Sequence, residues 1–174
     1  MIPTITNECS QFLNQSHGLP LLKNLSVGNV GIRKVKLRKK KKGNDITHAF
    51  NETFSDHSEL MQRAMFAHGM NSFSPSYENG LEPFYVFPID GYKFMYAENV
   101  DNTTESYKDT LNKLVETYGD NGIKTFKEIL KYQYNNDNLY DGMSSNAEII
   151  LYGIPYYYAI RCSLIENYAD FLSN

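Results

Sequence analysis

The sequence predicts an α+β fold in one domain, and three observations support this class. The chain has 174 residues, of which 41% are hydrophobic, enough to bury one core. Segments with the two-residue period of a strand alternate with segments that have the 3.6-residue period of a helix. Short runs rich in Gly, Asn and Pro separate them. We therefore expect residues 1–174 to form a single globular domain, in which residues 1–26 are the candidate for a loosely attached N-terminal segment.

A basic segment over residues 33–42 is the feature around which the chain is organised. Eight of its ten residues are cationic, whereas residues 43–174 hold eight basic and nineteen acidic residues and so carry a formal charge of −11. Val35 and Leu37 alternate with cations, which predicts a strand with the apolar side chains toward the core and the cations in solvent. The candidate binding residues in this segment are Arg33, Lys34, Lys36, Arg38, Lys39, Lys40, Lys41 and Lys42.

Helices are expected on both sides of this strand. Residues 5–16 fit a short helix, and Asn44 or Asp45 is suited to cap a helix that continues through Phe54. Asp56 followed by Glu59 resembles a capping box, which predicts a second helix to about His68. Residues 71–82 contain many turn formers and are expected to be a loop.

Two aromatic segments, residues 84–87 and 92–96, are expected to be strands. The intervening Asp90-Gly91 is a turn signal, so the pattern predicts an aromatic β-hairpin. Aromatic side chains beside a basic strand are able to stack on unpaired bases or anchor a protein partner. The candidate binding tyrosines are Tyr85, Tyr92 and Tyr96.

The C-terminal half is expected to be mainly helical. Apolar residues at helical spacing over 103–118 and 123–134, separated by Gly119 to Gly122, predict an αα-hairpin. Residues 135–146 are polar and fit a connector, and residues 148–152 fit a buried strand. Pro155 is suited to the first turn of a final C-terminal helix that includes Ile160 and Leu164.

The sequence offers little support for catalysis. The four histidines lie 31, 9 and 11 positions apart, so no two share a helical turn, and we expect no metal. No Gly-rich phosphate loop or Gly-x-Ser-x-Gly turn is present, and we expect no cofactor. Cys9 and Cys162 are far apart in the sequence, which favours free thiols in a reducing compartment.

One short pattern provides an enzyme alternative. Asn146-Ala147-Glu148 before an apolar strand, with Ser72-Phe73-Ser74 upstream, resembles about a dozen residues of the pattern of mono-ADP-ribosyltransferases. The resemblance implies that Glu148 is a catalytic glutamate acting on NAD, with Arg33 as a poor match to the family's arginine. Asn146 stands where the family has its first glutamate, and the Ser-x-Ser falls in an expected loop. We therefore expect a non-catalytic protein and keep Glu148 as the weaker alternative.

Charge distribution points instead to a binding function. A basic segment on an acidic body predicts electrostatic attraction to a host protein complex or to nucleic acid. Abundant Asn and scarce Ala are typical of AT-rich coding, which suggests a phage, a virus or a low-GC bacterium. No signal peptide or run of eighteen apolar residues is visible, so we expect a cytoplasmic protein with no membrane partner. The alternatives are a nucleic-acid-binding accessory protein and a virion assembly component.

Overall fold

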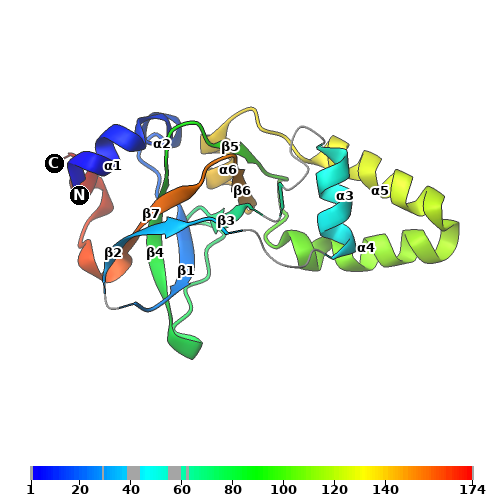
Figure 1. Cartoon of the computed structure of the whole chain (residues 1–174), viewed down its shortest axis with the longest axis horizontal. Helices are drawn as coiled ribbons and strands as arrows, with labels where there is room; N and C mark the ends of the chain where they lie inside the picture. Colours follow the sequence, from blue (N-terminus) through cyan, green and yellow to red (C-terminus); the bar gives the residue numbers. More distant parts are fainter. Residues whose placement is uncertain (1, 29, 39–43, 55–59, 62, 174) are drawn as a thin grey trace.

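The computed structural model describes residues 2–28, 30–38, 44–54, 60–61 and 63–173, and it confirms the expected α+β class. These residues form a seven-stranded antiparallel sheet with helices on its outer faces (Figure 1). In sheet order, the strands are β2 (Ile32–Lys36), β7 (Tyr156–Arg161), β4 (Leu81–Pro88), β1 (Leu22–Ser26), β3 (Met65–His68), β6 (Glu148–Tyr152) and β5 (Lys93–Met95). The helices are α1 (Ile2–Glu8), α2 (Ser10–Ser16), α3 (Asp45–Thr53), α4 (Thr103–Tyr118), α5 (Asp120–Gln133), α6 (Leu139–Ser144) and α7 (Tyr168–Ser173), with short 3-10 turns at Glu78–Gly80 and Cys162–Leu164.

The sheet divides into two halves between β1 and β3, which meet at the single register pair of Leu22 and His68. Both halves of the sheet contribute to the first hydrophobic core, which contains Val86 of β4 and Ala67 of β3, both fully buried, and includes residues on both faces of β4. On the other face of β4, the ring of Phe87 meets Phe12 of α2 edge-on, with the ring centroids 6.0 Å apart. Helices α1, α2 and α7 therefore cover the outer face of the half formed by β2, β7, β4 and β1.

The N-terminal segment belongs to this core, in place of the loosely attached segment that we expected. Cys9 and Phe12 are fully buried, and β1 lies in the middle of the sheet. The expected helix over 5–16 forms as two helices with Cys9 between them.

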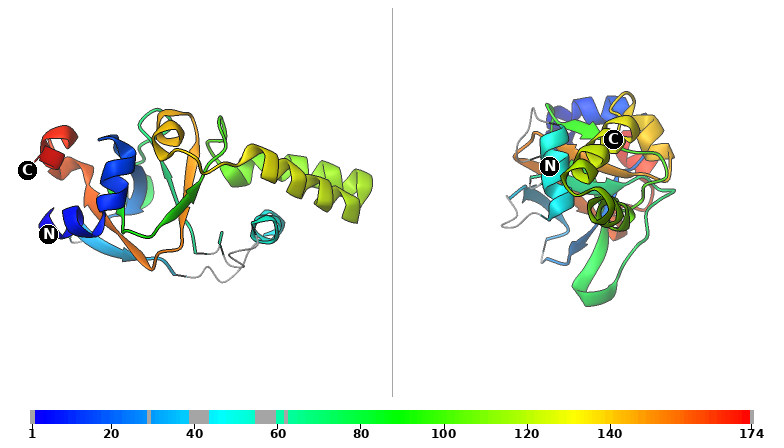
Figure 2. Two further views of the ribbon diagram at one scale, coloured as in Figure 1. Left: turned by 90° about the horizontal axis from the view of Figure 1, so that it is seen from above. Right: turned by 90° about the vertical axis from the view of Figure 1, so that its right-hand side faces the viewer.

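Helices α3, α4 and α5 form the helical end of the molecule, and α4 and α5 project from the sheet as the expected αα-hairpin (Figure 2). The second hydrophobic core of the molecule lies at this end, where Phe50, Phe126 and Leu130 pack against the outer face of β6. The N-cap of α4 is Asn102, whose side chain accepts a hydrogen bond from the Glu105 backbone N–H.

The aromatic hairpin was a wrong prediction. Both aromatic strands form, but β4 pairs with β1 and β7 whereas β5 pairs with β6. The Asp90-Gly91 turn therefore passes the chain from one half of the sheet to the other. A two-residue turn signal reports a change of direction, and it does not determine which strands become neighbours.

Three other segments differ from their predictions. Residues 156–161 form β7, so the C-terminal helix exists but begins at Tyr168. Residues 65–68 form β3 rather than the end of a helix that starts at Asp56, and residues 55–59 and 62 lie outside the described residues. The connector over 135–146 contains α6. A short apolar run fits the period of a helix or that of a strand. Residues 156–161 form a strand because they pair with β2 on one side and with β4 on the other.

Candidate binding surface at the basic sheet edge

The basic strand is confirmed, as β2, and it is the terminal strand of the sheet. Its register with β7 places Lys34 opposite Tyr158 and Lys36 opposite Tyr156. Both lysines are exposed, and so is Arg38 just beyond the strand. We call these three cations the basic edge. Lys39, Lys40, Lys41 and Lys42 lie outside the described residues.

Alternate residues of β2 point the other way and hold the strand in place. Val35 and Leu37 pack against the first core as expected, although both are only half-buried. Arg33 is also half-buried: it donates from Nη2 to the Ser26 carbonyl oxygen at 2.7 Å, and its guanidinium lies 4.8 Å from the centre of the Phe84 ring. Arg33 therefore fixes the β2 strand to its neighbours and stands apart from the basic edge.

Two tyrosines and a glutamate lie beside the basic edge. The hydroxyls of Tyr156 and Tyr158 each donate to the same Oε2 of Glu8 at 2.8 Å. The Lys34 ammonium lies 3.4 Å from the centre of the Tyr156 ring, a close cation–π contact. Glu8 ends α1, so this cluster joins the N-terminal helix to β7 and β2.

The electrostatics of the cluster follow from these contacts. The pKa of Glu8 lies below its ordinary value of 4.5. The hydrogen bond from the Tyr158 hydroxyl lowers it most, followed by the bond from the Tyr156 hydroxyl and, more weakly, by the charge of Lys34. Glu8 is therefore ionised at neutral pH, which sets one carboxylate beside the cations of the basic edge. The result is a positive surface whose tyrosines are held at fixed positions.

The three candidate binding tyrosines do not lie beside the basic edge. Tyr92 and Tyr96 are 3% and 4% exposed, so their rings belong to the core. Tyr85 is half-buried, with its ring 4.7 Å from that of Tyr168 in α7. The neighbours of the basic edge are instead Tyr156 and Tyr158, which sequence reasoning assigned to a helix. Pairing of β2 with β7 brings them there, and no local signal reports it.

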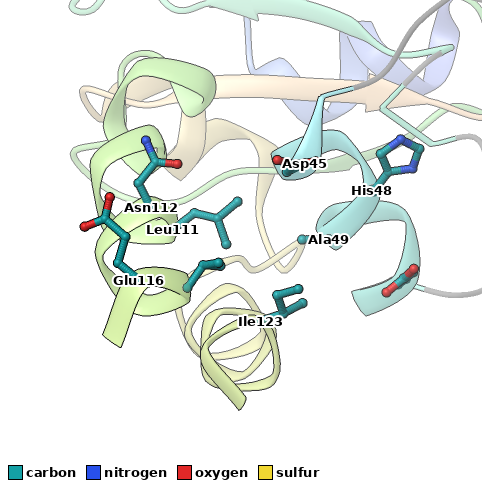
Figure 3. Close-up of a pocket in the computed structure, with 9 residues that line it drawn as sticks. Asp45, His48, Ala49, Leu111, Asn112, Glu116 and Ile123 are labelled. Carbon is teal, nitrogen blue, oxygen red and sulfur yellow. The ribbon is translucent and has the colours of Figure 1, made fainter. Parts of the chain in front are cut away.

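A pocket of about 390 Å³ lies at the helical end, between α3 and α4 (Figure 3). Its floor is apolar, with Leu111 and Val115 of α4 and Ile123 of α5. Carboxylates and polar groups surround the floor. The rim residues are Asp45, His48, Glu52, Asn112 and Glu116.

Two contacts hold α3 in place at the pocket. Lys127 of α5 forms an ion pair with Glu52, which ties α3 to the hairpin. Asn44 caps α3 by accepting from the Thr47 backbone N–H at 2.9 Å. This arrangement suits an apolar group that carries a positive charge, the opposite preference to that of the basic edge.

The residues of the enzyme alternative are only partly brought together. Glu148 begins β6, and its Oε2 accepts from the Thr103 backbone N–H at 3.0 Å, so it stabilises the start of α4. Ser72 is nearby, because its hydroxyl donates to the Ala147 carbonyl oxygen at 3.2 Å. Arg33 lies on β2, and four strands separate β2 from β6 in the sheet order.

The cysteines lack the environment of a nucleophile. Burial raises the pKa of Cys9 to about 12 and that of Cys162 to about 11, so both are thiols at neutral pH. Neither forms a disulfide. In the part of the chain that the structure describes, no three His, Cys, Asp or Glu side chains are placed to hold a metal ion.

Comparisons with known proteins add no assignment. Neither the models of known protein families, nor the curated proteins, nor the solved structures contain a match to this chain. Each helix of the described residues is too short or too polar to cross a membrane. A functional assignment must therefore rest on the two surfaces described above.

Proposed function

We propose that this chain is a non-catalytic protein that binds an anionic host macromolecule through the basic edge, and that it acts in the host cytoplasm as a phage or viral factor. The observation that carries the proposal is the position of Lys34 and Lys36. Both are exposed on one face of a terminal strand, and pairing with β7 holds that strand in place. Such a strand keeps its charges about 7 Å apart, so they can face a matching row of anionic groups.

An acidic protein surface suits this site better than unpaired nucleic acid. Stacking of bases needs exposed aromatic faces. Tyr92 and Tyr96 are buried, and the Lys34 ammonium lies over the Tyr156 ring. The Asn-rich, Ala-poor composition supports a phage or viral origin and hence a host partner.

The test is affinity capture from candidate host extracts with the protein and two charge variants. One variant changes the basic edge by Lys34→Gln, Lys36→Gln and Arg38→Gln. The matched control changes three exposed lysines of the helical end, by Lys108→Gln, Lys113→Gln and Lys124→Gln, and so removes the same charge. We expect the captured partner to be lost with the first variant and kept with the control.

Nuclease treatment separates the classes of partner. Capture that survives nuclease supports a protein partner. Capture that nuclease abolishes supports the nucleic-acid accessory alternative, in which the affinity falls steeply with salt. Equal capture by the two variants contradicts the proposal, since removing the basic edge would then have no specific effect.

A further inference from the structure

The outer side of β2 carries backbone groups that face away from the sheet. On the inner side, the Arg161 backbone N–H donates to the Gly31 carbonyl oxygen at 2.8 Å, and the Leu37 N–H donates to the Pro155 carbonyl oxygen at 2.9 Å. Backbone groups in an antiparallel ladder alternate in direction along the strand. The odd-numbered residues of β2 therefore face β7, and the backbone N–H and C=O groups of Ile32, Lys34 and Lys36 point outward. In the described part of the chain no strand pairs with that side.

The side chains beside this free edge differ between its two faces. Lys34 and Lys36 are exposed on the face that carries Tyr156 and Tyr158. Val35 and Leu37 lie on the opposite face, half-buried, so each still presents part of its apolar surface. An added strand would therefore meet cations on one face and apolar side chains on the other, with a period of two residues.

We infer that β2 is a docking edge for an extended acidic segment of a partner protein, in which carboxylates alternate with apolar residues. This inference rests on the proposed function and adds that the partner binds as an extended strand. Residues directly opposite each other on paired strands share a face. Glutamate or aspartate is thus expected opposite Lys34 and Lys36, and an apolar residue opposite Val35.

The same charges exclude a second copy of β2 as the occupant. Antiparallel pairing of two β2 strands would place lysines opposite or diagonal to lysines, and like charges across a ladder are destabilising. A duplex or single-stranded nucleic acid would satisfy the cations, but it would leave the outward backbone groups without a ladder. An acidic strand satisfies both the charges and the backbone.

The probe is a synthetic peptide, acetyl-Thr-Glu-Val-Glu-Val-Glu-Thr-amide with a fluorescent label, titrated against the whole chain at low salt. The control peptide has the same composition with its three glutamates adjacent. We expect the alternating peptide to bind about tenfold more tightly, since only its pattern matches both faces. An oligothymidylate of equal charge tests the rival ligand, and tighter binding of that oligonucleotide would overturn the inference.

N-methylation of the peptide tests the ladder itself. In the antiparallel arrangement that the rest of the sheet uses, the amides of the glutamates face β2 and the amides of the valines face away. Methylating the glutamate amides should weaken binding about tenfold or more, whereas methylating the valine amides should leave it within about twofold. The reverse preference would indicate parallel addition. Equal effects of the two sets would show that no ladder forms.

Two variants of the protein test the same backbone ladder by changing β2 in place of the peptide. Lys34→Ala removes the charge and keeps the outward N–H, whereas Lys34→Pro removes both and spares the bonds to β7. We expect Lys34→Pro to bind the peptide several-fold more weakly than Lys34→Ala, with the thermal midpoint of each recorded to confirm folding. Equal binding by the two folded variants contradicts strand addition. If the peptides fail while host capture still depends on the basic edge, only this inference fails and the proposed function stands.

Discussion

Strand β2, which carries the basic edge, and helices α3 and α4, which flank the pocket, lie toward opposite ends of the long axis of the molecule (Figure 1). The two sites differ in charge and in construction. The pocket has carboxylates around an apolar floor, and two of its helices, α4 and α5, are consecutive in the chain. The basic edge has exposed cations on β2, which among the described residues pairs only with β7, a strand near the end of the sequence. The αα-hairpin of the helical end is local in sequence, although α3 packs on it from a distant segment, whereas the basic edge depends on the pairing of β2 with the distant β7.

This difference predicts where stability resides. The helical end contains the second core, where Phe50, Phe126 and Leu130 are fully buried. In the described part of the chain, β2 is paired on one side, and its apolar residues are half-buried. A binding surface at the basic edge is therefore free to change its side chains at little cost to the fold. Leu111 on the pocket floor has no such freedom, because it is buried and forms part of the second core.

The largest expected effect is at the helical end, for Phe126→Ala. Phe126 is fully buried and its ring lies 5.7 Å from that of Tyr107, so truncation leaves a cavity between α4 and α5. We expect a loss of about 3–5 kcal/mol in the free energy of unfolding, measured by urea denaturation. Val35→Ala at the sheet edge should cost no more than about 1 kcal/mol, because the side chain is half-buried. Similar losses for the two variants would remove the contrast between the ends.

A second variant tests whether β2 depends on its apolar face. Val35→Asp with Leu37→Asp puts two carboxylates against the first core, and we expect a loss of roughly 2–3 kcal/mol in unfolding free energy. Lys36→Asp is the control on the exposed face, and it should change stability by no more than about 0.5 kcal/mol. Tolerance of the double variant in the same denaturation assay would mean that the strand is not anchored by these residues.

The sequence predicts the helical end well because its signals are local. Tyr107 and Leu111 lie one helical turn apart, both are buried, and the glycines after Tyr118 mark the turn of the hairpin. Gly122 also has a packing reason that no periodicity reports: a Cβ there would lie 2.1 Å from the Leu114 carbonyl oxygen. The elements are thus predictable, and the closeness of their packing is not.

At the basic edge, the strand is predictable from the sequence and its neighbours are not. Alternation of Val35 with lysines was enough to predict the strand and its two faces. Its neighbours depend on register, which pairs residue 34 with residue 158, and on Glu8, which accepts from both tyrosines. Contacts between segments so distant leave no pattern in a single sequence, so Tyr156 and Tyr158 were not among the candidate tyrosines. The same reason explains why β7 was predicted as a helix.

A smaller effect is expected for the ion pair that links α3 to α5. Lys127 and Glu52 are in contact, but the Glu52 side chain is 61% exposed and therefore well solvated. Lys127→Met should lower the unfolding free energy by about 0.5 kcal/mol or less at low salt, and the difference should shrink as salt is added. A loss several times larger, or one that salt does not change, would show that α3 depends on this pair rather than on the second core.

The smallest effect, and the one that is specific to the basic edge, is the pH dependence of the Glu8 cluster. The pKa of Glu8 is lowered in the folded protein, chiefly by the hydroxyls of Tyr158 and Tyr156. A carboxyl whose pKa is depressed by folding contributes stability above its ordinary pKa of 4.5, and this contribution is lost as the pH falls through the lowered folded value.

Glu8→Gln keeps an oxygen that can accept from the tyrosines but removes the charge. We therefore expect its thermal midpoint to lie below that of the unchanged protein near neutral pH, and the two midpoints to converge in acid. Glu116→Gln, which removes an exposed carboxylate at the other end, gives the baseline. A difference for Glu8→Gln that stays constant through the acid range, or that widens there, would mean that the charge of Glu8 does not hold α1 to the basic edge.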